Sequence, residues 1–458
     1  MIENDAFKLL LINLFHLNPD DIANILCTTF NKMMVLVVTL TDKHQACPYC
    51  GFTAPKIKEY VTKEITHSAL TTQKCIIKYR ARRYKCSCCG KTYYEFNPFV
   101  FKSQKISILT VHNILKDLKD FNETFTSVAR RYHVSPTSVS TIFDKHVDIG
   151  RNPLPEIINF DEVYAFKSEK SKYVCVLLDF KKQIPVDVLP NRKKEYLLNY
   201  FQKIPLEERK KVKYACSDMY EVYRDVVHKV FPSCCMLLDY FHLSQDFHRK
   251  MNEVRIKVMK GYKDNKASDE YYLLKKFNWL LFKNPEDEDK YGRLFDVERE
   301  RKYNSHFKSY MNYYDLRKKL LEINNDLTIC YSLKLELVDF YSKSTIDNAK
   351  VNLENLIRSC IDTNIEEMIA FSNNLINWKQ EIINSFTIVG TEYKVEADKG
   401  QVVVCNKKVN NAIIENRNKI IKCIKNNANG YTNWSRFRNR VMYVLDPNAT
   451  FSLEPREK

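Results

Sequence analysis

Two short cysteine motifs near the N-terminus constrain the fold of this chain more than any other feature. Cys47-Pro48-Tyr49-Cys50-Gly51 has the spacing CxxCG, and Cys86 and Cys89 repeat it with a glycine behind them. Two such turns direct four thiolates at one point, which suits tetrahedral zinc, and each glycine relieves the backbone where the turn becomes left-handed. The strand-like sequence between the motifs predicts a zinc ribbon over residues 46–96, with zinc held by Cys47, Cys50, Cys86 and Cys89.

Two alternatives to this ligand set stay open. Cys88 could replace a neighbouring ligand, or the clustered cysteines could be free or degraded. The chain has 15 cysteines, an odd number, and its first residues lack the basic, apolar and small-residue order of a signal peptide. We therefore expect a reducing compartment, in which clustered cysteines bind metal before they form disulfides.

The charge of the chain indicates a polyanionic partner. The 458 residues include 73 Lys plus Arg against 56 Asp plus Glu, a formal net charge of +17. Such an excess favours salt-sensitive binding to nucleic acid, although a generally basic proteome would produce it too. The most apolar run, Met33 to Leu40, is far shorter than a membrane span requires. We expect a soluble cytoplasmic protein with no membrane partner.

Basic residues lie directly before the second cysteine motif. Arg80, Arg82 and Arg83 interleave with aromatic residues in the sequence KYRARRYKC. This pattern suits contact with a phosphate backbone, and the alternative is a solvated strand face.

Residues 103–150 predict a helix-turn-helix. Thr124–Tyr132 reads as the first helix, and Ser135 can cap the second with Pro136 at its first position. Thr137, Ser138 and Thr141 would then be exposed toward the major groove of DNA. Any amphipathic helix pair would show a similar pattern.

After a proline-rich linker at 152–155, the pattern becomes three short strands, a helix, a strand, a helix and a strand. An early hairpin followed by alternating strands and helices predicts a mixed sheet with helices on its faces, the order of an RNase H-like fold. Residues 243–400 read as a large all-α insertion. We expect a multidomain α+β protein.

Acidic residues stand at the ends of these predicted elements. Asp161 closes the first strand and Asp218 the fourth, and neighbouring strands would bring the two carboxylates together, where Mg²⁺ suits them. Glu415 is the expected third acid, on a helix that shares its face with Lys419 and Lys422 and buries isoleucines opposite. Two Mg²⁺ ions held by such a triad can activate a water or a 3′-hydroxyl. Glu162 should point to the other face of its strand.

Asp239 and His242 follow the last predicted strand. The pair could support the site, or it could be a capped helix start with a structural histidine.

The sequence resembles the insertion-sequence transposases of the ISL3 family. The resemblance rests on the two cysteine motifs, the helix-turn-helix, and the sequences FDEVYAF, SDMYEVY, DYFHL and IIENRNKIIK. It implies a bacterial, nucleoid-associated DNA transposase in which Asp161, Asp218 and Glu415 form the DDE triad. Mg²⁺ or Mn²⁺ would serve catalysis and Zn²⁺ the ribbon. Double-stranded DNA, as element ends and target, and a homo-oligomer formed on DNA are the implied partners.

The expected domains follow from these motifs. They are an N-terminal helix and strand segment (1–45), the zinc ribbon (46–96), the helix-turn-helix (103–150), the first part of the catalytic core (155–242), the helical insertion (243–400) and the C-terminal helices of the core (401–446).

Two other functions remain compatible with the sequence. One is a catalytically silent regulator derived from a transposase, and the other is a structure-guided nuclease without strand transfer. Metal-dependent cleavage separates the first from a transposase, and joined products separate the second.

Overall fold

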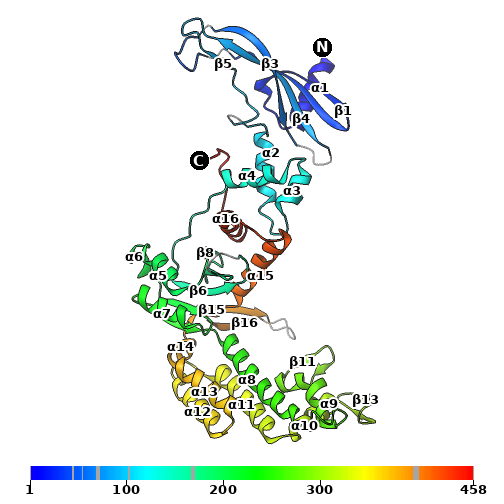
Figure 1. The fold of residues 1–458 in the computed structure, drawn as a ribbon, viewed down its shortest axis with the longest axis vertical. Helices are drawn as coiled ribbons and strands as arrows, with labels where there is room; N and C mark the ends of the chain where they lie inside the picture. The colour runs from blue at the N-terminus through cyan, green and yellow to red at the C-terminus, as the bar shows by residue number, and fades with distance from the viewer. Residues whose placement is uncertain are drawn as a thin grey trace.

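The computed structural model describes residues 2–43, 46–53, 55–68, 73–101, 104–166, 171–395 and 402–456. The molecule is elongated, with a sheet at the N-terminal end, a helical region at the opposite end and a second sheet between them (Figure 1). The described residues include no helix that is both long and apolar enough to cross a bilayer.

The N-terminal sheet contains more of the chain than the cysteine motifs alone predicted. It has the order β1-β2-β4-β3, with β5 paired to β4. Its elements are α1 (Ile2–Leu14), η1 (Pro19–Asp21), β1 (Ile22–Phe30), β2 (Met33–Leu40), β3 (Lys56–Thr66), β4 (Cys75–Lys85) and β5 (Thr92–Tyr94). Where one strand was expected before residue 45, Asn31 and Lys32 adopt positive φ values and turn the chain into a hairpin. Because β2 pairs with β4 in parallel, β1 and β2 share one sheet with β3 and β4 of the ribbon.

Three helices follow, and their caps agree with the sequence. They are α2 (Ile108–Asp117), α3 (Phe125–Arg131) and α4 (Pro136–His146). Thr124 caps α3 through a capping box, and the Ser135 side chain accepts from the Ser138 amide at the start of α4, with Pro136 in the first turn. Val128, Ala129 and Val139 are buried between the helices. Two helices joined by a short turn thus lie close to the residues at which the sequence predicts them.

The central sheet is mixed, as the sequence pattern predicts. Its order is β10-β9-β6-β7-β8, in which β6, β9 and β10 run parallel while β7 and β8 complete an antiparallel meander. The elements are β6 (Ile157–Val163), β7 (Val174–Asp179), β8 (Pro185–Leu189), α5 (Lys194–Gln202), α6 (Leu206–Arg209), β9 (Tyr214–Ser217), α7 (Glu221–Val230) and β10 (Cys235–Leu238). Asp161 does not end its strand, because β6 continues to Val163 in pairing with β7.

The region after β10 is largely helical. Its helices are α8 (Tyr240–Lys260), α9 (Asp269–Lys276), η2 (Asn278–Phe282), α10 (Tyr313–Glu322), α11 (Asn325–Lys343), α12 (Ala349–Asp362), α13 (Glu366–Asn377) and α14 (Lys379–Asn384). They surround a core of their own, which includes Phe247, Leu337 and Phe371. This is the segment for which no role could be read from the sequence.

The expectation that 243–400 is entirely α-helical was wrong. Two hairpins interrupt the helices, β11 (Glu288–Asp289) with β12 (Gly292–Arg293) and β13 (Lys302–Asn304) with β14 (Ser309–Met311). A longer ribbon, β15 (Ile388–Val395) with β16 (Val402–Lys408), leads back to the central sheet. Strands of two or three residues in charged sequence are too short to show a two-residue hydrophobic period, and Gly292 supplies the positive φ of one turn.

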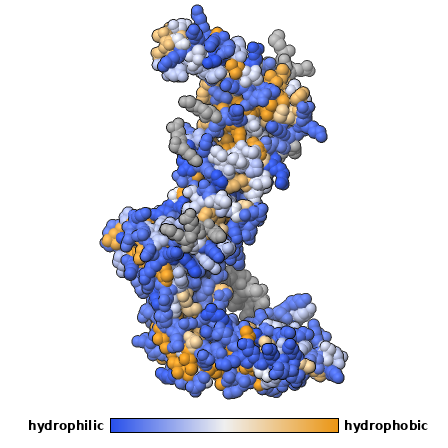
Figure 2. Space-filling view, viewed as in Figure 1, coloured by the Kyte–Doolittle hydropathy of each residue, from blue (hydrophilic) through white to orange (hydrophobic). Residues whose placement is uncertain are grey.

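The last two helices cover the central sheet on the face opposite α5 and α7. These are α15 (Ala412–Asn427) and α16 (Trp434–Leu445), which bury Ile414, Ile421 and Phe437 against β7 and β8. The tail then reaches α4, where the Ser452 amide donates to the His146 carbonyl. Most of the surface seen in Figure 2 is hydrophilic, as expected for a strongly charged chain.

Candidate active site

Three aspartates meet at one edge of the central sheet. In the parallel ladder β6-β9-β10, Cys216 pairs with both Asn159 and Leu237. Counting two residues forward on each strand brings Asp161, Asp218 and Asp239 to the same level at the carboxyl ends. This placement of Asp161 beside Asp218 agrees with the expectation from the strand order, and the register adds Asp239 on the other side.

Strand alternation separates Asp161 from Glu162. The Asp161 carboxylate accepts a 2.7 Å hydrogen bond from Asn418 of α15, on one face of the sheet. Glu162 lies on the opposite face, where Arg192 and the Tyr223 hydroxyl of α7 donate to it. The Arg192 guanidinium is itself stacked on the Tyr220 ring, 4.5 Å from its centroid. Glu162 is therefore engaged away from the three aspartates.

Reciprocal amide contacts hold the start of α15 against β6. The Asn159 side chain donates to the Asn411 side chain over 2.7 Å, and Asn411 donates in turn to the Phe160 carbonyl over 3.3 Å. The backbone N–H of Asn411 also donates to the Asp239 carboxylate over 3.3 Å. Because Asn411 precedes the first residue of α15, these contacts fix the first turn of that helix, which carries Glu415.

Glu415 lies beside Asp239 and His242. The His242 Nε2 atom is 3.7 Å from Asp239 and 3.8 Å from Glu415. One ligand atom from each of these three side chains lies within 4.8 Å of the others. Asp239 and His242, three residues apart at the start of α8, are thus neighbours of Glu415. The sequence did not predict this contact. His242 is also close enough to lower the pKa of Asp161 and of Asp218, against the larger opposing effect of burial.

Burial leaves the negative charge of this edge poorly compensated. It raises the pKa of Asp161 to about 7, and neighbouring Glu162 and Asp218 add to this effect. The pKa of Asp218 is raised to about 6, mainly by burial and then by the charge of Glu162. The pKa of Asp239 is also raised by burial, against the opposing charge of His242. Carboxyl groups in such surroundings are stabilised by a proton or a cation.

The donor set fits a divalent cation. Asp218 Oδ1, Asp239 Oδ2 and His242 Nε2 are buried and have no hydrogen-bond partner among the described residues, and Asn418 Oδ1 shares this property. Buried polar atoms are normally paired. Carboxylate and amide oxygens are the ligands that Mg²⁺ prefers, and imidazole is acceptable to Mn²⁺. The residues could hold one or more such ions at this edge.

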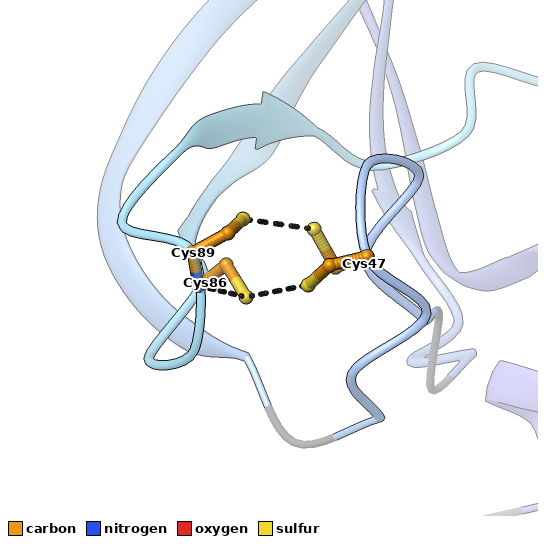
Figure 3. A group of neighbouring side chains, drawn as sticks. Cys47, Cys86 and Cys89 are labelled. Carbon is orange, nitrogen blue, oxygen red and sulfur yellow. Dashed lines mark hydrogen bonds between the residues drawn. The ribbon is translucent and has the colours of Figure 1, made fainter.

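The four cysteines of the two motifs form a second metal-ligand group. Cys47 Sγ lies 3.7 Å from Cys89 Sγ, and Cys50 Sγ lies 3.5 Å from Cys86 Sγ. Figure 3 shows the sulfur atoms of the two turns directed at each other. Four sulfurs at about 2.3 Å from a tetrahedral zinc ion would lie roughly 3.8 Å apart, so the spacing fits zinc.

The backbone around these cysteines has the geometry that the sequence predicts. Gly51 and Gly90 have φ values of 75° and 70°. The Cys89 amide donates to Cys86 Sγ, and this bond, with a second from Cys88, lowers the pKa of Cys86 to about 7. A lowered pKa favours the thiolate, which is the form that binds metal. Cys88 is exposed and is not a member of the four-sulfur group.

The three arginines proposed to contact DNA differ in their surroundings. Arg80 is exposed and stacks on Tyr60, 4.9 Å from the ring centroid. The Arg82 side chain is only 14% exposed and pairs with Glu95 at 2.8 Å, so it joins β4 to the segment after β5. Arg83 pairs with Glu59 across the β3–β4 ladder at 2.6 Å. Arg80 is the arginine left available to a ligand.

The remaining DNA-contact candidates lie on helix surfaces. Thr137 and Thr141 of α4 are exposed, whereas Ser138 is partly covered and takes part in capping the helix. Lys419 and Lys422 of α15 are exposed, whereas Asn418, directly before Lys419, points inward to Asp161.

Comparisons with known proteins agree on one group. The family model DDE_Tnp_ISL3, described as a transposase, matches residues 158–397. A similar protein, the transposase for insertion sequence element IS1001 of Bordetella parapertussis, is 19% identical over 411 residues. That alignment covers 89% of this chain and 91% of the Bordetella protein. The family match includes Asp161, Asp218 and Asp239 and ends before Glu415.

Proposed function

Because the chain belongs to the ISL3 family of transposases, we propose that it binds the terminal inverted repeats of its insertion sequence and cuts and joins DNA strands at a metal-dependent DDE site. Membership of the family implies an enzyme that acts on DNA. The proposal adds to this the terminal repeats as the DNA substrate, the divalent metal and the residues that hold it.

One observation supports the location of this site above all others. Asp161, Asp218 and Asp239 gather at the ends of three parallel strands, and Asp218 and Asp239 each have a buried oxygen atom with no hydrogen-bond partner among the described residues. The partly exposed Glu415 of α15 lies beside Asp239 and His242. Uncompensated buried charge is costly without a cation. A chain does not accumulate several such groups at one edge for the sake of stability alone.

We assign the triad roles to Asp161, Asp218 and Glu415, with Asp239 and His242 beside them. A bound Mg²⁺, for which Mn²⁺ should substitute, would lower the pKa of the attacking water or 3′-hydroxyl and stabilise the leaving oxygen. Within the protein, Asn418 orients Asp161, and the Asn411 amide orients Asp239. His242 Nε2 lies 3.7 Å from Asp239 and 3.8 Å from Glu415, where it could join these acids as a metal ligand.

The other parts of the chain receive roles that follow from their chemistry. We interpret the central sheet with α15 and α16 as an RNase H-like core in two pieces, 155–242 and 401–446. Zn²⁺ on the four cysteines would fold the ribbon of residues 46–96, and α4 within 103–150 would enter the major groove. Residues 1–45 extend the ribbon sheet. We infer a homo-oligomer, because two element ends must be handled together.

Arg80 of the ribbon, with Thr137 and Thr141 of α4, would contact the element ends. Lys419 and Lys422 lie on α15 beside the catalytic edge and would contact phosphates near the scissile bond, where Lys serves as a point charge. Arg82, Arg83 and Ser138 already have partners in the fold and would contribute less directly.

The test compares two aspartates that are close in sequence but differ in location. Asp218 lies at the sheet edge, and Asp225 lies on α7. Asp218→Asn should abolish Mg²⁺-dependent cleavage of DNA carrying the element end, while the affinity for that DNA is retained. Asp225→Asn, which alters an exposed acid of α7 paired with Lys194, should cleave at the wild-type rate. Cleavage by Asp218→Asn would refute the assignment, and a wild-type protein that binds but never cleaves would indicate a silent regulator.

A further inference from the structure

A pocket lies in the helical region, away from the catalytic edge. It has a volume of about 660 Å³ and is enclosed by α9, the hairpins β11–β12 and β13–β14, and the start of α10. Figure 1 shows these hairpins beside α9 at the far end of the molecule from the N-terminal sheet. A volume of this size is typical of sites that take a small molecule or one flexible segment.

Tyrosines on the hairpins are unusually exposed. Tyr291 and Tyr303, which line the pocket, are 68% and 58% exposed, and Tyr310, the cross-strand partner of Tyr303, is 69% exposed. Large aromatic side chains are normally covered in a folded protein. Rings presented on short hairpins at the mouth of a pocket are available to stack on a planar ligand.

Basic groups surround the Tyr291 ring. The Lys290 ammonium lies 4.7 Å from the ring centroid, and Arg299 and Lys302 each lie 5.9 Å from it. Arg299 is held in place by Asp289 at 2.6 Å, so its charge is largely used within the protein. Lys302 and Lys276 also line the pocket and can meet an anionic group.

We propose that this pocket, the tyrosine pocket, binds an unpaired nucleotide of single-stranded DNA, with the base stacked against both Tyr291 and Tyr303 and a phosphate beside Lys276 and Lys302. The inference rests on the proposed function, since it assumes that DNA is the substrate. Aromatic rings interleaved with cations are the usual means of binding single strands without sequence preference.

The size of the pocket excludes a double helix, and its weak net charge means that a bound base is held mainly by stacking. A cavity of this volume can admit a base only when that base is unpaired. The acids Asp296 and Glu300 also line it, so the pocket is only weakly positive. Single-stranded DNA should therefore bind with a shallow salt dependence, equivalent to about one or two phosphates. Duplex binding by the ribbon and α4 should be much more sensitive to salt.

Helix α8 sets the separation between the pocket and the catalytic edge. It begins beside Asp239 and spans 21 residues before the turn into α9. At about 1.5 Å per residue it is roughly 32 Å long. A stacked strand rising about 3.4 Å per nucleotide would cover that length in roughly nine nucleotides. The pocket would thus hold a strand well away from the scissile phosphate, so its loss should leave the chemistry intact.

The experiment uses the full chain and a fluorescein-labelled oligothymidylate of about 15 nucleotides, followed by fluorescence anisotropy. Tyr291→Ala and Tyr303→Ala should each weaken binding by about tenfold, as expected for the loss of one stacking ring. Tyr291→Phe should bind as the wild type does, because stacking does not require the hydroxyl. Ile361→Ala, which removes an exposed apolar side chain of α12 outside the pocket, should remain within about twofold of wild type.

Three results would overturn the proposal. They are unchanged oligothymidylate binding in both alanine variants, an equal loss of binding in Ile361→Ala, and displacement of the oligonucleotide by free thymidine monophosphate at a concentration similar to that of the oligonucleotide itself. The last would assign the pocket to a free nucleotide instead of a strand.

A parallel assay separates this proposal from the proposed function. Asp218→Asn should bind oligothymidylate normally, and Tyr291→Ala should still cleave the element end. If the wild type never cleaves but its binding to the oligonucleotide depends on Tyr291, the pocket stands and the enzymatic assignment fails. If cleavage is lost in Asp218→Asn but Tyr291→Ala binds oligothymidylate as the wild type does, only the pocket proposal is refuted.

Discussion

Asn418 donates a 2.7 Å hydrogen bond to the carboxylate of Asp161, although 257 residues separate them in the chain. Both side chains are buried. The bond joins the last part of the chain to the first strand of the central sheet, and the other Asp161 oxygen accepts from the backbone N–H of Glu162. The orientation of the Asp161 carboxylate therefore depends on a helix contributed by the C-terminal segment.

Replacing Asn418 should disturb metal use before it disturbs DNA binding. In Asn418→Ala, Asp161 loses the donor that orients it, and the Mg²⁺ concentration for half-maximal cleavage should rise by about 10- to 100-fold, the usual effect of removing a partner of a metal ligand. Cleavage titrated with Mg²⁺ measures this. Asn416→Ala, on the exposed side of the same helix, is the control and should match wild type. Equal behaviour of the two variants would exclude a positioning role for Asn418.

The raised pKa values predict how stability depends on pH without magnesium. The pKa of Asp218 is about 6 in the folded protein against an ordinary value of 3.8. Between these values the folded protein retains a proton that the unfolded chain has released, so the free energy of unfolding falls as pH rises through this window. Asp218 alone should change it by about 2 kcal/mol between pH 4.5 and pH 8.

Asp218→Asn should therefore raise the melting temperature at pH 8 in magnesium-free buffer and change it much less at pH 4.5. Adding Mg²⁺ should stabilise the wild type more at pH 8 than at pH 5, because the cation competes with the proton for the same oxygens. Thermal unfolding followed by intrinsic fluorescence gives both comparisons. A variant less stable than wild type at pH 8 would contradict the uncompensated charge at this edge.

The cysteine group predicts a metal content of one zinc ion per chain. Cys50→Ser or Cys89→Ser should lose that ion, and the N-terminal sheet should become sensitive to proteolysis, because structural zinc contributes directly to folding. Cys88→Ser should keep it, since Cys88 stands outside the four-sulfur group. Elemental analysis of purified protein decides between these outcomes, and zinc loss in Cys88→Ser would mean that the ligand set differs.

Two arginines of one strand should give opposite phenotypes. Arg80→Ala should weaken DNA binding and reduce the slope of log affinity against log salt by about one, with no effect on unfolding. Arg82→Ala removes the partner of Glu95, whose side chain is only 6% exposed, and should lower stability by about 2–3 kcal/mol. Salt titrations and denaturation curves for both variants distinguish a phosphate contact from a structural ion pair.

Local sequence was sufficient to predict the structure wherever a short motif determines its own backbone geometry. The turns at the two cysteine motifs and the serine cap before Pro136 appear where the sequence predicts them. The strands and helices around Asp161 and Asp218 were also predictable, because burial on both faces of a sheet requires continuous apolar runs. The very short strands at Glu288–Asp289 and Lys302–Asn304 were not, since so few residues carry no period.

The sequence by itself determined which residue types could bind zinc, which could bind a hard divalent cation, and that Asp161 would lie beside Asp218. Only the tertiary structure decided which groups surround Glu415 and which basic residues remain available to DNA. The physical reason is that Asn411 and Asn418 dock α15 on β6 across some 250 residues of chain, a contact that no local pattern encodes. In the same way, Arg80 and Arg82 look equivalent in the sequence until Glu95 folds back to pair with one of them.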